Sequence, residues 1–136
     1  MTERPAPVIH PETQFFWDAA RESRLLLQRC TACNETYYPP RPFCPSCASR
    51  AVEPRPASGK ATLYSYVISH MPAPGYEPPF AVAVVLLEEG VKMMCNIVDC
   101  PPEPEHLVLD MPLELVFEQR GDMAVPQFRP VAGGAA

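Results

Sequence analysis

Residues 30–47 read CTACNETYYPPRPFCPSC, and the four cysteines in this stretch follow the spacing C-x2-C-x10-C-x2-C: Cys30, Cys33, Cys44 and Cys47. Each C-x2-C pair places two thiolates on one side of a tight turn, called a knuckle here, and two facing knuckles supply four sulfur ligands for one ion. An all-sulfur ligand set favours zinc first and iron second. The alternative is two disulfides, but this paired spacing in a chain without a secretory leader favours a metal. A closed four-thiolate site is normally structural, because it leaves no position open for a substrate.

The composition is that of a folded chain. Hydrophobic residues make up 47% of the 136 residues, which argues for a packed core and against general disorder. No run of about 18 apolar residues occurs, so we expect no membrane span. Residues 1–11 are rich in proline and charge and lack the apolar stretch of a signal peptide. We therefore expect a reducing, cytoplasmic compartment, in which Cys95 and Cys100 are free thiols and Cys95 packs as a small core residue.

Charge is unevenly distributed along the chain. Residues 1–60 contain eight Lys or Arg and six Asp or Glu, whereas residues 61–136 contain three and ten. An acidic second half is a poor match for a nucleic-acid backbone.

Clusters of proline separate the predicted elements, and the cluster at residues 54–56 is read as a connection. Residues 11–22 are predicted to form one short helix, because Pro11 suits a first helical turn and Phe16 and Ala20 lie on one face. The adjacent Phe15, Phe16 and Trp17 give this helix a large apolar load, which must dock on the chain itself or on a partner.

A zinc ribbon is predicted to follow the helix. Residues 24–29 should form a strand that leads into the first knuckle, and Tyr37 and Tyr38 should be extended before the prolines that precede the second knuckle. Such a ribbon has too little apolar core to fold alone, so metal binding would contribute most of its stability.

The rest of the chain is predicted to be all-β. Residues 60–70 alternate well, with Leu63 and Val67 on one face and Tyr64 and Tyr66 on the other. Residues 80–87 form a β-branched run, as expected of a strand buried on both faces or in a small barrel. Further strands are expected at 91–98, 111–118 and 124–130; Gly90 supplies a hairpin turn, and Pro126 places the last strand at an edge. Five strands in roughly 70 residues fit a closed barrel of the OB type, with residues 101–109 connecting its third and fourth strands.

The predicted protein is therefore mainly β and has four parts. They are an N-terminal arm and helix (1–29), a zinc ribbon (30–58), an OB-fold domain (59–131) and a disordered tail (132–136).

The chain resembles the DUF35 family, whose members combine an N-terminal helix, a rubredoxin-like zinc ribbon and a C-terminal OB-fold. The resemblance is carried by five stretches: FFWDAARESRLLLQRC, TACNETYYPPRPFCPSC, GKATLYSYVISH, FAVAVVLLEEGVKM and VPQFRPV. The family favours Gly after each second cysteine and at the end of the helix, where this chain has Asn34, Ala48 and Ser23. Asn tolerates the left-handed conformation of a knuckle, whereas Ala48 costs more, so we expect a less regular second knuckle or a weaker metal site.

The resemblance implies an accessory role beside an enzyme that acts on acyl-CoA. Proteins of this kind are subunits of thiolase-type enzymes, of thiolase-like aldolases acting on steroid side-chain acyl-CoAs, and of some hotdog-fold hydratases. The partner then holds the catalytic groups, while the DUF35 subunit docks on it and helps to complete the CoA or acyl channel. The usual assembly is a partner homodimer flanked by two such subunits, α2β2.

The residues themselves offer no catalytic set. None of the three histidines (His10, His70 and His106) stands beside a Ser or Cys with an evident orienting group, so we expect no catalysis by this chain alone.

The best candidate contact is the segment 71–79, called the contact loop below. Four prolines stiffen it, and OB-folds commonly bind through this first loop. We predict that His70, Tyr76 and Phe80 line the contact with the partner or the acyl-CoA, although Phe80 also suits the barrel core and His70 a solvated strand end. Arg41 could pair with a CoA phosphate or simply be solvated. Trp17 is the candidate docking residue of the helix.

Two other function classes remain open. A nucleic-acid-binding ribbon and OB module would need a basic groove with stacking aromatics, and the acidic second half counts against it. A small electron carrier would hold iron in the four-cysteine site, as rubredoxin-like knuckles could allow.

Overall fold

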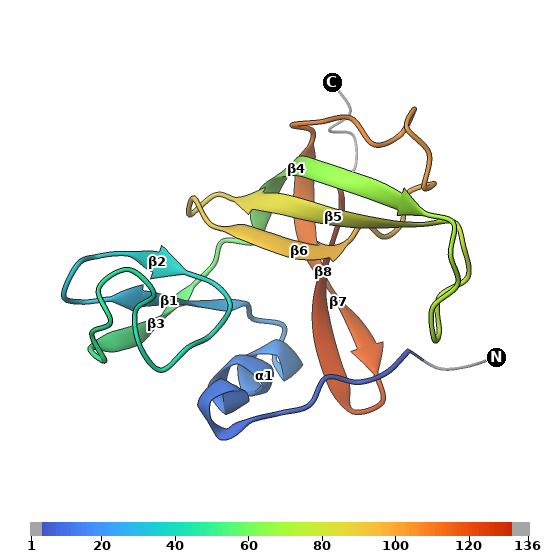
Figure 1. Cartoon of the computed structure of the whole chain (residues 1–136). Coiled ribbons are helices and arrows are strands. Elements are labelled where there is room, and N and C mark those ends of the chain that lie inside the picture. Colours follow the sequence, from blue (N-terminus) through green and yellow to red (C-terminus); the bar gives the residue numbers. More distant parts are fainter. Residues whose placement is uncertain (1–3, 132–136) are drawn as a thin grey trace.

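The computed structural model describes residues 4–131 and contains one short helix followed by two antiparallel sheets (Figure 1). The predicted mainly-β architecture is confirmed, and the predicted tail, 132–136, lies outside the described residues. The ribbon sheet has the strand order β2-β1-β3 and the barrel sheet the order β6-β5-β4-β7-β8. The elements, in chain order, are η1 (Pro11–Thr13), α1 (Gln14–Arg21), β1 (Leu26–Cys30), β2 (Thr36–Tyr37), β3 (Val52–Pro56), β4 (Lys60–Ser69), β5 (Phe80–Leu87), β6 (Lys92–Asn96), β7 (Pro112–Arg120) and β8 (Met123–Pro130).

The N-terminal helix docks on its own chain. The predicted segment 11–22 is a 3-10 turn followed by α1, and Phe16 and Ala20 are both buried on one face, as expected. The Phe16 side chain is only 2% exposed and belongs to the core of the barrel, together with Leu25 and Leu27 from the start of the ribbon. In Figure 1, α1 lies beneath the barrel next to β7 and β8. The helix therefore closes one side of the barrel and anchors the ribbon to it.

The ribbon sheet differs from the prediction at its third strand. Residues 54–56 were expected to be a connection because of their prolines, yet Pro54 and Pro56 lie within β3, opposite Gln28 and Leu26 of β1. The prediction was wrong because β3 is an edge strand. A proline at a sheet edge needs no ladder partner for its missing N–H group, so the backbone remains extended.

Burial alternates along β5 and changes partway along β4. Along β5 the buried residues are Ala81, Ala83, Val85 and Leu87, and the intervening side chains are half-buried. The predicted uniform alternation of residues 60–70 was wrong: the register of β4 shifts between Leu63 and Ser65, which is a β-bulge at Tyr64. Before the bulge the odd positions are buried, and after it Tyr66 and Ile68 turn toward the core instead.

The barrel closes between its first and last edges. Pro126 lies in β8, which is the last strand of the sheet order, as expected. The backbone N–H of Val98 donates to the carbonyl of Phe128 at 2.9 Å, and the N–H of Asn96 donates to the side chain of Gln127 at 2.6 Å. Between β6 and β8 a few backbone and side-chain hydrogen bonds thus close the barrel in place of a continuous strand ladder.

The predicted connection between the third and fourth barrel strands is confirmed. It joins β6 to β7 without regular structure, and Leu107 is buried in the core and anchors it. Within residues 4–131, no helix has the length and apolar character needed to cross a membrane.

Truncation of Phe16 should destabilise the whole protein, because its ring fills the barrel core. We expect Phe16→Ala to lower the free energy of unfolding by about 3–5 kcal/mol, measured by urea denaturation. Phe15→Ala is the matched control, since Phe15 is only half-buried and should lose clearly less. Equal losses in the two variants would show that the helix does not contribute to the core as described.

Candidate metal centre and contact loop

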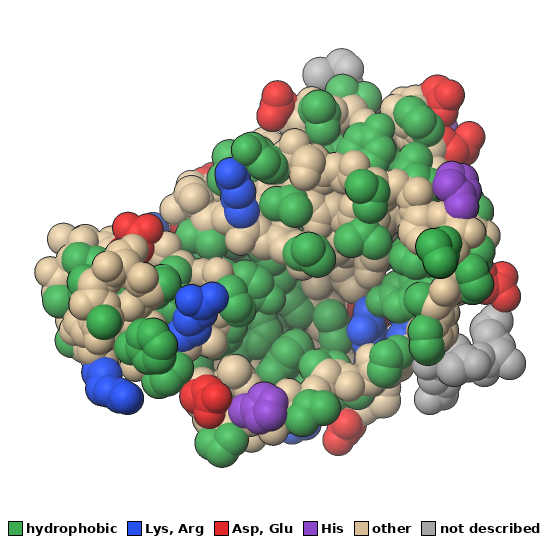
Figure 2. All heavy atoms as spheres, in the orientation of Figure 1, with side chains coloured by type: hydrophobic (Ala, Val, Ile, Leu, Met, Phe, Trp, Pro, Cys, Tyr) green, Lys and Arg blue, Asp and Glu red, His purple; other side chains and the backbone are tan. Residues whose placement is uncertain are grey.

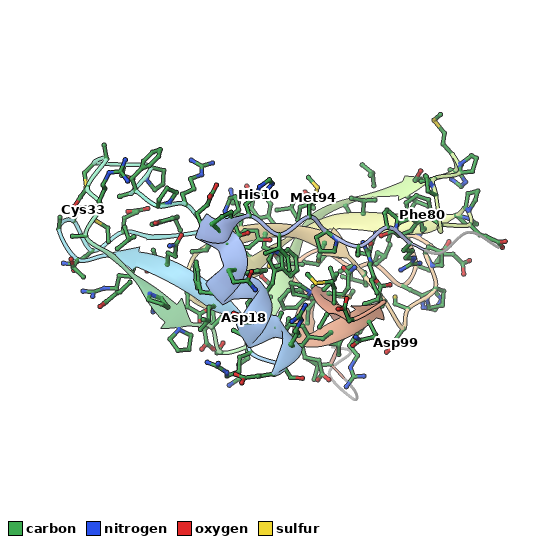
Figure 3. The ribbon with its side chains drawn as sticks, turned by 90° about the horizontal axis from the view of Figure 1, so that it is seen from below. His10, Asp18, Cys33, Phe80, Met94 and Asp99 are labelled. Carbon is green, nitrogen blue, oxygen red and sulfur yellow. The ribbon has the colours of Figure 1, made fainter. Side chains whose placement is uncertain are left out.

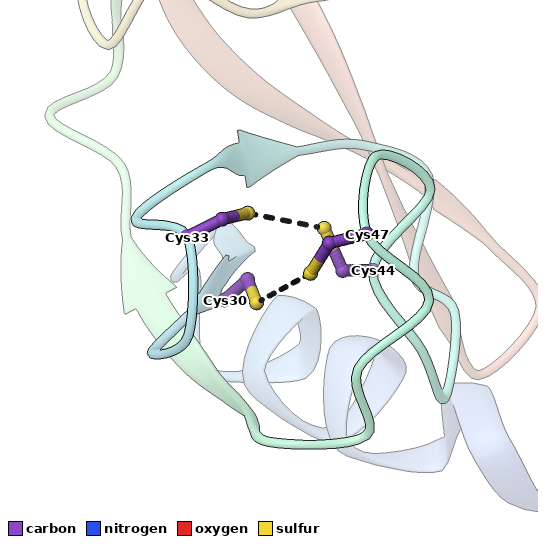
Figure 4. A group of neighbouring side chains, drawn as sticks. All are labelled: Cys30, Cys33, Cys44 and Cys47. Atoms are coloured by element: carbon purple, nitrogen blue, oxygen red, sulfur yellow. Dashed lines mark hydrogen bonds between the residues drawn. The ribbon is translucent and has the colours of Figure 1, made fainter.

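The four cysteines converge at one end of the ribbon (Figure 4). All four Sγ atoms lie within 4.8 Å of one another, and the closest pairs across the two knuckles are Cys30 with Cys47 and Cys33 with Cys44, each at 3.6 Å. A tetrahedral zinc site with Zn–S bonds of about 2.3 Å has sulfur–sulfur edges of roughly 3.8 Å. None of these cysteines forms a disulfide. The sulfurs therefore have the spacing of metal ligands, as the sequence spacing predicts.

The two knuckles have the same backbone geometry. The N–H of Asn34 donates to the carbonyl of Cys30 at 2.8 Å, and the N–H of Ala48 donates to the carbonyl of Cys44 at 2.9 Å. Asn34 and Ala48 are both left-handed, with φ of 66° and 65°. The expectation of a less regular second knuckle was wrong, because Ala48 adopts the conformation that glycine would adopt and keeps its hydrogen bond. Ser23, at the end of the helix, is left-handed as well, with φ of 61°.

The electrostatics of the site call for a cation. The backbone N–H of Cys33 donates to the sulfur of Cys30 and lowers the pKa of Cys30 to about 7. At Cys44, burial raises the thiol pKa, but the N–H groups of Cys47 and Ser46 outweigh this and leave the pKa lowered. At Cys33, the N–H of Glu35 lowers the pKa, but burial and the facing sulfur of Cys44 outweigh it and raise the pKa to about 12. Two of the four thiols, Cys30 and Cys44, thus ionise more readily than the facing Cys33, and a bound divalent ion would favour the thiolate form of all four.

The ribbon loop that carries Arg41 is fixed through its backbone. The buried side chain of Gln28 accepts a hydrogen bond from the N–H of Arg41 at 2.5 Å, and the Tyr37 hydroxyl donates to the Arg41 carbonyl at 2.9 Å. Burial raises the pKa of Tyr37, so this hydroxyl stays protonated and can donate. The Arg41 side chain is exposed. Its guanidinium therefore projects from a rigid base.

The contact loop lies at the far end of the barrel from the metal centre; Figure 3 shows Cys33 and Phe80 at opposite ends of the molecule. The ring of Tyr76 stacks on Phe80 with centroids 4.9 Å apart and an interplanar angle of 34°. The guanidinium of Arg4, which belongs to the N-terminal arm, lies 4.0 Å from the centre of the Tyr76 ring. The structure thus brings Tyr76 and Phe80 together.

A polar network, missed by the sequence analysis, holds the contact loop in place. The Tyr76 hydroxyl accepts a hydrogen bond from Arg120 at 2.5 Å and donates to Asn96 at 3.2 Å. Glu118 binds both Arg4 and Arg120, and Arg4 also donates to the carbonyl of Gly75 at 3.1 Å. A Cβ atom on Gly75 would meet the backbone of Arg4 at 2.5 Å, so the arm and the loop are in direct contact. These residues are far apart in the sequence, and no local pattern marks them.

Of the other predicted contact residues, His70 lies beside the Tyr76–Phe80 pair and Trp17 lies on the helix. His70 is exposed and follows Ser69, which pairs with Phe80 across β4 and β5. Trp17 is half-buried, and its ring packs edge-on against Phe16 with centroids 4.9 Å apart. Of the two remaining thiols, Cys95 is buried in the core and Cys100 is partly buried; burial raises the pKa of Cys95 to about 12 and also raises that of Cys100.

Comparison with known proteins places this architecture in a family. The ribbon matches the family model "ChsH2, rubredoxin-like zinc ribbon domain" over residues 17–53, and the barrel matches "ChsH2, C-terminal OB-fold domain" over residues 54–118. The fold and the four cysteines define a zinc-ribbon and OB-fold protein. A DUF35 domain-containing scaffold protein of Methanocaldococcus jannaschii is 34% identical over 107 residues, which are 76% of this chain and 74% of that protein. The chain belongs to the DUF35 family.

Two further relatives carry functional names. A probable enoyl-CoA hydratase alpha subunit of Thermomonospora curvata is 37% identical over 129 residues, which are 93% of this chain; the chain spans 40% of the length of that relative. Among solved structures, a chain of the Ltp2-ChsH2(DUF35) aldolase superposes with a TM-score of 0.81 at 35% identity, covering 92% of this chain and 98% of that one.

Removal of the metal should unfold the ribbon but not the barrel, because the described apolar core lies mainly in the barrel. We expect the purified protein to be colourless with one zinc ion per chain, and a chelator under reducing conditions to abolish amide-exchange protection in β1–β3 first. Cys44→Ser should do the same, whereas Cys100→Ser, outside the cluster, should retain the metal. A red, reducible protein would identify iron instead, and a metal-free protein with oxidised cysteines would contradict the site.

The left-handed Ala48 gives a separate test of the second knuckle. Ala48→Gly should stabilise the metal-bound ribbon by about 1 kcal/mol, because glycine adopts this conformation without a Cβ penalty. Competition with a chromogenic chelator measures the gain. Ala51→Gly is the control in the same ribbon, since Ala51 is not left-handed and should show no gain. Loss of metal affinity in both variants would argue against strain at Ala48.

Proposed function

We propose that this chain is a non-catalytic accessory subunit that binds a thiolase-type enzyme, either a thiolase or a thiolase-like steroid side-chain aldolase, and helps to bind or channel its acyl-CoA substrate. The observation that carries the proposal is the match to the DUF35 chain of the Ltp2-ChsH2(DUF35) aldolase, because it extends over 98% of that chain. A near-complete match favours the same kind of assembly over a shared domain alone.

The chemistry of the side chains supports a role without catalysis. A four-sulfur site leaves no open position for a substrate. Raised pKa values at Cys95 and Cys100 mean that neither thiol is activated as a nucleophile. The partner enzyme would supply the reacting groups, in an α2β2 assembly of a partner homodimer and two of these subunits. A cytoplasmic location belongs to the proposal, because reducing conditions keep the four cysteines available for zinc.

We assign the acyl-CoA or partner contacts to residues at both ends of the molecule. Tyr76 and Phe80, with His70 beside them, form an aromatic surface on a stiff loop, which loses little entropy on binding. Arg41 projects from the fixed ribbon loop, and a guanidinium binds phosphate well. The ribbon half of the sequence is also the less acidic half, which suits the phosphates of CoA. Trp17 is proposed as a partner contact through the half of its side chain that remains exposed.

The second candidate is an accessory subunit of a hotdog-fold enoyl-CoA hydratase. It is favoured by the hydratase alpha subunit of T. curvata, at 37% identity. Because this chain spans 40% of that relative, a hydratase role would require further polypeptide, in the same protein or in a partner.

The proposal predicts that the contact loop affects the complex and not the fold. Tyr76→Ala should weaken assembly with the thiolase-type partner enzyme, or lower its acyl-CoA turnover, by about tenfold. Co-expression, size-exclusion chromatography and steady-state kinetics measure both. Tyr64→Ala is the matched control, since Tyr64 is an exposed barrel tyrosine with a Lys92 ammonium 4.0 Å from its ring centre. Unchanged assembly and activity in Tyr76→Ala would remove this contact site, and failure of the wild-type chain to bind the enzyme would remove the proposal.

A further inference from the structure

The connection between β6 and β7 is strongly acidic. Residues 99–110 read DCPPEPEHLVLD and contain four carboxylates and no Lys or Arg. Asp99 forms an ion pair with Arg129 at 3.5 Å, and Arg129 is also bound by Glu114 at 2.8 Å. No ion pair among the described residues engages Glu103, Glu105 or Asp110. Arg129 is therefore already bound by two carboxylates, and within residues 4–131 the other three carboxylates of the connection have no ion-pair partner.

The same connection borders a cavity with an apolar interior. Its volume is about 550 Å³, which lies in the range of ligand pockets. The apolar lining comes from Val108, Leu109 and Met111 of the connection side and from Pro112, Pro130 and Val131 at the ends of the last two strands. Glu105 and Asp110 border it as well. Figure 2 shows acidic side chains beside apolar ones over the region of this connection, at the upper right.

Hydrogen bonds to the barrel hold the connection in a shape that leaves two of its apolar side chains exposed to solvent. Leu107 is buried, but the two residues that follow it, Val108 and Leu109, are 58% and 56% exposed. The N–H of Asp110 donates to the carbonyl of Leu63 at 2.7 Å, so this end is tied to β4. Asp99 and Asp110 are both left-handed, with φ of 55° and 68°, and such strained residues concentrate at functional sites. The cavity is therefore preformed.

We propose that this cavity is a docking site for a partner-protein segment in which an apolar side chain is flanked by Lys or Arg. The apolar side chain enters the cavity and contacts Leu109 and Met111, while the flanking cations pair with Glu105 and Asp110 at its border. Glu103, in the same connection but outside the cavity lining, adds to the negative charge that attracts them. Charge complementarity selects this occupant, because CoA phosphates and fatty-acid carboxylates would be repelled by the same rim. That the partner is a thiolase-type enzyme rests on the proposed function. The apolar and basic character of the docked segment rests only on the cavity and its carboxylates.

The experiment measures binding of the co-purified thiolase-type enzyme by isothermal titration calorimetry at low and high salt. Leu109→Asp, and the double variant Glu103→Lys with Glu105→Lys, should each weaken binding about tenfold, and the wild-type affinity should fall as salt rises. Val8→Asp and Glu12→Lys are matched controls at exposed positions outside the cavity and should bind as the wild type does. Thermal unfolding confirms that each variant is folded.

A second titration separates this inference from the proposed function. A short helical peptide of leucine and lysine should bind the wild-type chain and lose affinity in both cavity variants, whereas the same peptide with glutamate for lysine should not bind. If the enzyme does not bind at all, the proposed function fails and the peptide alone decides the inference. Equal binding of the two peptides, or binding that is insensitive to Leu109→Asp and to the charge reversals, overturns it.

Discussion

Four sulfurs held within 4.8 Å of one another are the constraint on which the ribbon depends. Thiolates at this spacing repel one another. A backbone N–H lowers the pKa of Cys30, whereas at Cys33 the lowering by the N–H of Glu35 is outweighed by burial and the facing sulfurs, which raise the pKa. A bound divalent cation would convert the repulsion between thiolates into attraction and would stabilise a ribbon that otherwise has a two-residue strand, two tight turns and an edge strand containing prolines. We therefore expect the fold of residues 26–56 to depend on metal binding as well as on apolar burial.

The ribbon is nevertheless not an independent appendage. Leu25 and Leu27 lie in the same core as Phe16 and the barrel residue Leu63, so the helix and the first ribbon strand are packed into the barrel. At the other end, the arm is bound to the contact loop through Arg4, Glu118 and Tyr76. The molecule thus presents several surfaces in fixed relative positions: the ribbon loop with Arg41, the aromatic contact loop, and the acidic connection. Fixed surfaces of different chemistry are what a subunit needs if it is to bind a ligand and an enzyme at once.

Much of the fold could be predicted from the sequence because it follows from local patterns. The cysteine spacing, the pairing of Phe16 with Ala20, and the β-branched run of residues 80–87 each depend on residues close in the chain. The bulge at Tyr64 and the extended Pro54 and Pro56 could not be predicted, since both depend on which neighbouring strand is present. The network of Arg4, Glu118 and Tyr76 joins three distant segments, and only the three-dimensional fold brings them together. The division into four parts and the roles of His70, Tyr76, Phe80, Arg41 and Trp17 stay predictions.

Native mass spectrometry of the chain co-purified with its partner enzyme tests the central claim most directly, with thioester turnover measured on the same sample. The account predicts a complex of one partner homodimer and two of these chains, one zinc ion in each, and turnover in the complex but none in the isolated chain. Turnover of a thioester by the isolated chain, or an intact complex whose chains carry no metal, would contradict it.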